Sequence, residues 1–140
     1  MRSKPTPNAR QAGFTLLEML AVIVLLGIVA TIVVRQVGGN VDKGKYGAGK
    51  AQLASLSMKI ESFALDVGAP PASLEQLLHK PTYASRWAGP YAKPSDLLDP
   101  FGHPFAYHYP GSHGSFDLIF LGQDGAAGGE GYKADFGNWE

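Results

Sequence analysis

The chain has 140 residues, 45% of them hydrophobic and 11% aromatic, with twelve basic residues, twelve acidic residues and no cysteine. This length allows one small folded domain beside a membrane segment, and a zero formal charge gives no support for nucleic-acid binding. The charges are segregated, because residues 35–59 contain five bases and one acid, whereas residues 96–140 contain seven acids and one base. The acidic end is poorly suited to nucleic acid, and the basic stretch favours a solvated helix face over a lipid or partner site.

Residues 14–34 form an apolar run that is interrupted by one acid, Glu18. As an α-helix this run of 21 residues reaches about 30 Å, which is the thickness of the hydrocarbon core of a bilayer. An unpaired carboxylate costs about 3 kcal/mol at the bilayer centre. Glu18 therefore either reaches the headgroup zone from the first helical turn or needs a partner, and the second alternative makes it a candidate functional residue.

The segment before the apolar run, residues 1–13, contains three bases and no acid and ends at Gly13. The positive-inside bias predicts that this segment stays in the cytoplasm. A secretory signal is cut after its apolar stretch, whereas here the small residue precedes the stretch. Cutting between Gly13 and Phe14 would leave the helix on the product and create an amine on Phe14, on the helix face of Glu18 four residues later.

Gly13 followed by FTLLE and the apolar run resembles the class III signal of type IV pilins and pseudopilins. The resemblance implies that an inner-membrane prepilin peptidase cuts after Gly13 and methylates the new amino terminus at Phe14. It also implies that Glu18, together with such an amine, places each subunit against its neighbour in a helical filament. Ala12 departs from the family, which often has a basic residue there. We therefore expect a cleaved leader (1–13) and a single-pass helix (14–34) in the cell inner membrane, with the amino terminus cytoplasmic before cleavage and the carboxyl-terminal part periplasmic.

Residues 35–67 combine a glycine-rich stretch with an apolar stripe. Five glycines lie within residues 38–49, each costing roughly 1 kcal/mol in a helix, so propensity alone predicts a linker there. Beyond it, apolar residues recur every three or four positions from Leu53 to Val67, and Gly68 ends the pattern. Pilins carry both parts in one long rod with a stretch that can melt. We therefore expect residues 35–67 to continue the long helix, with residues 38–49 as its extensible stretch.

Residues 68–140 are expected to form the periplasmic globular part. Ser73 and Gln76 match a capping box and predict a short helix through His79. The segments FAYHY (105–109) and FDLIFL (116–121) are aromatic, surround a turn sequence and predict an antiparallel hairpin. The predicted fold class is α+β and pilin-like, with a long amino-terminal helix packed on a small antiparallel sheet.

The last twenty residues are rich in glycine and acids, which suits neither a helix nor a strand. Calcium prefers carboxylate and main-chain carbonyl oxygens, and glycines allow a backbone to fold such carbonyls inward. The spacing does not match an EF-hand, and composition alone favours a solvated acidic loop.

A longer resemblance bears on this loop. The sequence from Asp99 to Trp139 is similar to the major pseudopilins of type II secretion systems, whose terminal loop binds one structural calcium. The resemblance implies a single calcium ion held by two side chains and by main-chain carbonyls, with one further acid as a candidate. These residues are Asp124 and Asp135, the carbonyls of Leu121, Ala126 and Gly129, and Glu130. Gln123 stands where the family commonly has a small residue.

No other chemistry is indicated. The spacings of His79, His103, His108 and His113 match no common zinc site, and no phosphate-binding glycine loop is present. Ser112 and His113 near Asp117 do not make a triad, so we expect no catalytic residues and no enzyme.

The sequence thus predicts the major structural subunit of the type II secretion pseudopilus, polymerised from the inner membrane to drive export of folded proteins across the outer membrane. The expected partners are further copies of the chain, minor pseudopilins, prepilin peptidase and the inner-membrane assembly platform, and no nucleic acid. The alternatives are a type IV pilin for adhesion, motility or DNA uptake, against which the missing cysteines and the calcium-type loop argue, and a membrane-anchored periplasmic binding module.

Overall fold

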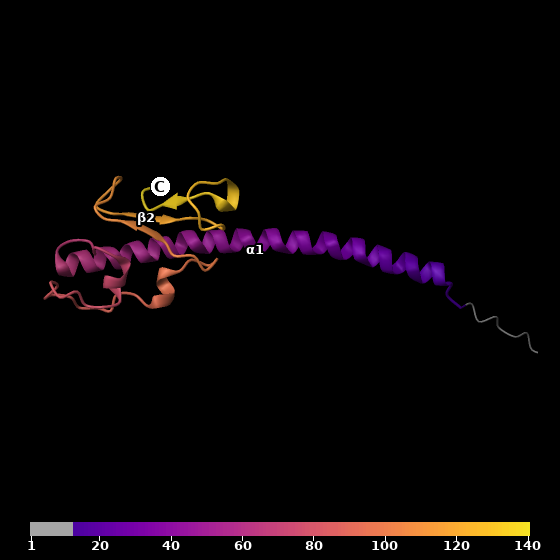
Figure 1. Cartoon of the computed structure of the whole chain (residues 1–140), viewed down its shortest axis with the longest axis horizontal. Coiled ribbons are helices and arrows are strands. Elements are labelled where there is room, and N and C mark those ends of the chain that lie inside the picture. The colour runs from indigo at the N-terminus through magenta and orange to yellow at the C-terminus, as the bar shows by residue number, and fades with distance from the viewer. Residues whose placement is uncertain (1–12) are drawn as a thin grey trace, which may run out of the picture. The chain divides into compact units, whose positions relative to one another are not determined.

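A computed structural model of the protein describes residues 13–140 (Figure 1). The predicted leader, apart from Gly13, lies outside the described residues. The chain divides into two compact units at the Gly38 to Gly39 bond, and each unit is described by itself.

The long helix α1 runs from Leu16 to Val67. In the first unit its apolar side chains are exposed, from 44% at Val22 to 89% at Leu16. By length and composition α1 can cross a membrane, with a mean hydropathy of 2.8 in its most apolar window. Such a surface is stable only when lipid or other apolar side chains cover it.

The glycine-rich stretch is helical, so the linker that propensity predicts is not seen. Four of its glycines face open space, but the fifth, Gly49, lies directly against the ring of Phe120. Helix α1 then ends at Val67, and Gly68 adopts a left-handed conformation with φ of 104°, which confirms the predicted stop.

Three short strands form one antiparallel sheet in the order β1, β2, β3. Strand β1 is Ala106–His108, β2 is Asp117–Phe120 and β3 is Phe136–Gly137. Tyr107 pairs with Leu118, which confirms the predicted hairpin, and Phe120 pairs with Phe136. The third strand corrects the expectation that the last twenty residues contain no strand.

Short 3₁₀ helices complete the second unit. They are η1 (Leu74–Leu77), η2 (Pro94–Leu97) and η3 (Gly131–Lys133). The capping-box prediction is wrong, because Ser73 makes no side-chain cap and η1 ends before His79. The Gln76 carboxamide oxygen instead accepts the Ala72 N–H at 2.9 Å, one residue before the predicted donor.

The core of the second unit is built on the predicted stripe of α1. In the view of Figure 1, strand β2 lies on one side of this part of α1, and the chain from residue 68 to residue 98 lies on the other. Residues from all three segments are buried in one cluster, which contains Leu53, Leu56, Ile60, Phe63, Leu74, Leu77, Ala92, Phe105, Phe116, Leu118 and Phe120. Two layers thus cover opposite sides of one helix, and this arrangement positions the carboxyl-terminal loop.

Candidate functional site

The predicted processing site lies at the beginning of α1. Gly13 and Phe14 precede the helix, and Phe14 is 79% exposed. The Thr15 hydroxyl accepts the Glu18 N–H at 3.1 Å, which caps the helix. Glu18 therefore stands in the first turn, where the helix dipole favours a negative charge. The helix begins at Leu16, two residues after Phe14, so Phe14 precedes the helix and Glu18 lies in its first turn.

Glycines shape the carboxyl-terminal loop that carries the predicted metal ligands. Gly122 and Gly129 have φ of 70° and 98°, conformations that favour glycine. A Cβ added at either position would lie 2.7 Å from the Lys133 carbonyl oxygen. The Gln123 N–H donates to the Tyr132 carbonyl at 2.8 Å and closes the loop. The chain therefore folds back tightly on itself, which a solvated acidic tail does not require.

The two aspartates predicted as ligands both face main-chain groups of the loop. Asp124 Oδ1 accepts the Ala126 N–H at 3.2 Å, and Asp135 Oδ2 accepts the Gly128 N–H at 2.8 Å. Asp135 Oδ1 is buried and has no hydrogen-bond partner among the described residues. A buried carboxylate oxygen without a partner is costly, and a cation is the kind of group that would satisfy it.

The other predicted metal ligands differ from one another in how exposed they are. Among residues 13–140 no three side chains of His, Asp or Glu gather to hold a metal, so most ligands would have to be main-chain carbonyls. Leu121 is half-buried, whereas Ala126 and Gly129 are exposed. Glu130 is also exposed, at the residue before η3, where its carbonyl accepts the Lys133 N–H at 3.2 Å.

A cluster on α1 holds the loop, and the sequence analysis did not predict it. The Tyr46 hydroxyl donates to the Ala134 carbonyl at 3.0 Å, and the Lys50 ammonium lies 4.1 Å from the centre of the Phe136 ring. Burial, together with the negative charges of Glu140 and Asp135, raises the pKa of Tyr46 and so keeps its hydroxyl a donor. The available signal was that Tyr46 is the single aromatic residue in the glycine-rich stretch.

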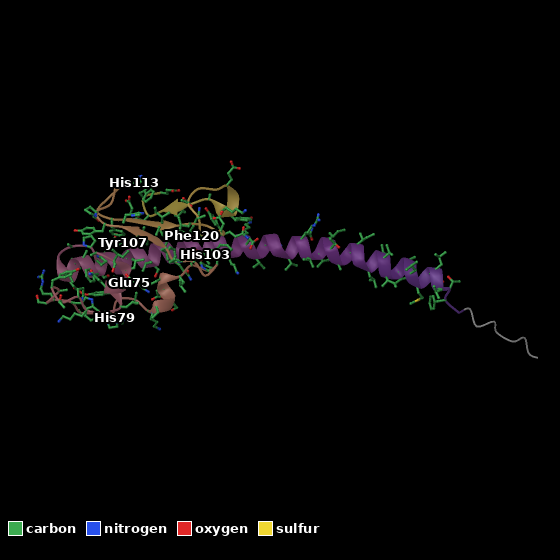
Figure 2. All side chains as sticks on the ribbon, viewed as in Figure 1. Glu75, His79, His103, Tyr107, His113 and Phe120 are labelled. Carbon is green, nitrogen blue, oxygen red and sulfur yellow. The ribbon has the colours of Figure 1, made fainter. Side chains whose placement is uncertain are left out.

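The turn from Asp99 to His103 supports the loop elsewhere. Asp99 Oδ1 accepts the N–H groups of Phe101 and His103 at 2.8 and 3.0 Å, which closes the turn. The His103 ring, labelled in Figure 2, lies so close to Gly125 that an added Cβ would come within 2.6 Å of it. A side chain at position 125 would therefore displace either the ring or the loop.

The end of the chain is fixed by polar contacts near His113, which Figure 2 labels. The His113 ring stacks on Trp139 with 3.8 Å between centroids, and its Nδ1 lies 3.1 Å from Asp117 Oδ2. Burial alone would raise the pKa of Asp117, but donation from the Ser112 and His113 N–H groups outweighs it and lowers this pKa. The sequence analysis considered Ser112, His113 and Asp117 only as a catalytic triad and did not predict the stacking of His113 on Trp139.

Comparison with known proteins agrees with the geometry at both ends. Residues 36–139 match the family described as type II secretion system (T2SS), protein G, and residues 8–34 match the prokaryotic N-terminal methylation motif. The type II secretion system core protein G of Xanthomonas campestris pv. campestris is 49% identical over 91% of this chain and 90% of the relative. The protein of the same name from Pseudomonas aeruginosa is 38% identical, with coverage of 94% and 96%.

A solved structure supports the same assignment. The major pseudopilin from the type 2 secretion system of enterohaemorrhagic Escherichia coli matches with a TM-score of 0.59 and 26% identity. The match covers 72% of this chain and 91% of that chain.

These comparisons confirm the predicted pilin-like fold and the pseudopilin function, and they do not favour the type IV pilin alternative. Membership of such a family implies assembly with other pseudopilins in a pseudopilus, as a structural subunit of the secretion system. An apolar amino-terminal helix in this family also fits anchoring in the inner membrane. The chain belongs to the protein G family of type II secretion systems.

Proposed function

We propose that this pseudopilin is cut after Gly13 by prepilin peptidase and methylated at Phe14. It is then held in the inner membrane by residues 14–34, with its folded part in the periplasm. From there the assembly platform polymerises it as the major subunit, minor pseudopilins join the same filament, and the filament drives folded proteins across the outer membrane. It works without catalysis of its own and without nucleic acid.

The observation that carries this proposal is the position of Glu18 in the first turn of an exposed apolar helix, four residues after Phe14. A carboxylate left in lipid costs about 3 kcal/mol, and pairing it with an amine removes much of that cost. In a filament, the amine of an adjoining subunit can supply the partner. In any other register between subunits the Glu18 carboxylate stays unpaired and the filament is less stable. This one acid therefore favours assembly and sets the register of the subunits.

The experiment compares Glu18→Ala with Glu61→Ala, which removes an exposed acid of α1 outside the apolar run. Electron microscopy of filaments formed on overexpression, membrane fractionation and secretion of folded proteins are the three measurements. We expect Glu18→Ala to remain cleaved and inserted while filaments and secretion are lost, and Glu61→Ala to keep all three. Filaments of normal yield from Glu18→Ala would show that the acid has no role in assembly, as expected for a membrane-anchored binding module.

We further propose that the carboxyl-terminal loop binds one structural calcium ion. Asp124 and Asp135 supply the side-chain oxygens, the carbonyls of Leu121, Ala126 and Gly129 supply the main-chain oxygens, and Glu130 is a further candidate. The support is the buried, unpartnered Oδ1 of Asp135 in a tightly folded loop. Calcium supplies two positive charges there, which would hold the loop closed at the end of the folded part.

Thermal unfolding of the full chain in detergent, with calcium or with a chelator, tests this site. Calcium at 100 times its dissociation constant stabilises the folded state by about 2.7 kcal/mol, which predicts a midpoint higher by roughly 10 °C. Asp124→Asn and Asp135→Asn should abolish this shift, Glu130→Gln tests the further candidate, and Glu75→Gln, an exposed acid outside the loop, should retain the shift. An unchanged midpoint of the wild-type chain on chelation would refute calcium binding.

A further inference from the structure

Between Gly39 and Gly49, helix α1 contains two kinds of glycine. A Cβ added at Gly39, Gly44 or Gly47 would meet no described atom within 4 Å, whereas at Gly49 it would collide with the Phe120 ring. Packing therefore requires a glycine at position 49 and not at the other three. Because glycine weakens a helix, this segment is helical only if other contacts support it.

The contacts that support it come from the carboxyl-terminal loop, from Phe120 of β2 and from Phe101, whose ring centre lies 5.5 Å from the Lys45 ammonium. Tyr46, between the open glycines, donates its hydroxyl to the Ala134 carbonyl at 3.0 Å. Its ring lies 5.3 Å from the ring of Phe120 and 5.9 Å from that of Tyr132. One turn later the Lys50 ammonium lies over the rings of both Tyr46 and Phe136, at 5.1 and 4.1 Å. A weak stretch of helix and a glycine-rich loop thus hold each other.

We propose that Tyr46 is a latch that couples the order of the carboxyl-terminal loop to the helicity of α1 from Gly39 to Gly49. Opening the loop removes the hydroxyl's acceptor and permits this stretch to unwind, and unwinding it in turn releases Ala134. Since Ala134 directly precedes Asp135, a cation held in the loop also stabilises the helix. Coupling of this kind is reciprocal, so each side changes the opening equilibrium of the other by the same factor.

The latch sets a limit to extension of the rod. While the loop is closed, the hydrogen bond of Tyr46 opposes unwinding of the stretch from Gly39 to Gly49. The stretch unwinds together with the opening of the loop. The cation-dependent part of this inference rests on the proposed calcium site, and the hydrogen bond itself does not.

Hydrogen exchange of the full chain in detergent, measured by mass spectrometry, tests the latch. Tyr46→Phe removes only the hydroxyl, and Tyr132→Phe is the matched control, because the Tyr132 hydroxyl makes no hydrogen bond among residues 13–140. A net hydrogen bond of ordinary strength predicts about fivefold faster exchange in Tyr46→Phe, in peptides covering residues 40–48 and in those covering 130–136 alike. Tyr132→Phe should leave the exchange of residues 40–48 unchanged.

A second variant approaches the latch from the helix side. Gly44→Ala strengthens the helix without a steric conflict, so it should slow exchange in residues 40–48 and, through the latch, in residues 130–136. Slower exchange in the helix with no change in the loop would overturn the proposal. So would an effect of Tyr46→Phe on the helix no larger than that of Tyr132→Phe.

Calcium separates this inference from the proposed metal site. If calcium binds, it should slow exchange in the loop and in residues 40–48 of the wild-type chain, and less so in the helix of Tyr46→Phe. If calcium changes neither segment while Tyr46→Phe still accelerates both, the metal site is refuted and the latch is supported. If calcium slows the loop but not the helix of the wild-type chain, the latch is refuted and the metal site stands.

Discussion

Asn138 provides the sharpest test of how the carboxyl-terminal end is held in a chain with no cysteine. Its side-chain oxygen accepts the Leu118 N–H at 2.9 Å, and its amide nitrogen donates to the Phe116 carbonyl at 3.3 Å. Its own N–H donates to the Leu118 carbonyl at 3.0 Å. The side chain thus acts as an extra piece of strand beside β2, and Asn138→Ala removes it.

The expected loss in the free energy of unfolding follows from the burial of Leu118. Leu118 is 0% exposed, so Asn138→Ala leaves its N–H without an acceptor, at a cost of about 1–3 kcal/mol. The lost bond to Phe116 adds about 1 kcal/mol, which gives roughly 2–4 kcal/mol in the free energy of unfolding. Asn40→Ala is the control, because Asn40 is an exposed asparagine of α1 and its replacement should not lower the free energy of unfolding.

The assay is urea unfolding of the full chain in detergent, followed by tryptophan fluorescence, since Trp139 stacks on His113 beside this site. With a slope of about 1–3 kcal/mol per M, Asn138→Ala should lower the midpoint by roughly 1–2 M, whereas Asn40→Ala should not lower it. The reasoning is refuted if Asn138→Ala lies within about 0.5 kcal/mol of the wild type, or if both variants lose the same stability.

Two further predictions concern packing and charge. Gly49→Ala should lower the free energy of unfolding by about 1–3 kcal/mol, because the new Cβ meets the Phe120 ring, whereas Gly44→Ala should raise it by about 0.4–1 kcal/mol. Thermal or urea unfolding of the two variants checks this, and equal effects of one sign would contradict it. Asp117 has a pKa below its ordinary value of 3.8 when folded, so its ionised form stabilises the fold above that pH and the contribution is lost as pH falls. The urea midpoint should therefore drop between pH 6 and pH 3, and the drop should be smaller in Asp117→Asn, whose unaltered pH dependence would refute the assignment.

Local patterns predicted the parts of the fold that depend on local chemistry. The stripe from Leu53 to Phe63 is buried as its spacing indicates, and Gly68 ends the helix. The aromatic segments 105–109 and 116–121 pair as the predicted antiparallel hairpin, with Tyr107 opposite Leu118. At the amino-terminal end, Gly13 and Glu18 could be recognised because a glycine directly before an apolar run and a single acid within that run form a specific pattern.

Contacts between distant residues account for what the sequence did not reveal. Propensity alone gave a linker for the glycine-rich stretch, whereas the resemblance to pilins gave the continuous helix that is seen, and the contact of Tyr46 with Ala134, 88 positions away, was not predicted. Strand β3 has only two residues and is defined by pairing with β2, which no periodicity can show. The capping box failed for a related reason, because the Gln76 side chain accepts from Ala72 and from the Tyr83 hydroxyl instead.

The candidate metal site was likewise predicted only in part from the sequence. The resemblance gave Asp124 and Asp135 as candidate ligands, but the backbone fold around the buried Asp135 Oδ1 includes the close approach of Gly122 and Gly129 to Lys133. That closure depends on the left-handed dihedral angles of glycines within one short loop. No spacing rule predicts which carbonyls turn inward as a result.

The buried stripe of α1 also determines when this protein can fold during synthesis. Residues Leu53 to Phe63 are made more than fifty residues before Phe116, which begins the segment that covers one of their sides. At roughly 5–20 residues per second, the stripe waits several seconds with no strand to pack against. Strand β3 arrives later still, so the sheet forms only on a nearly complete chain. Synthesis interrupted between Phe63 and Phe116 would therefore leave one side of this helix uncovered, a state prone to aggregation and proteolysis.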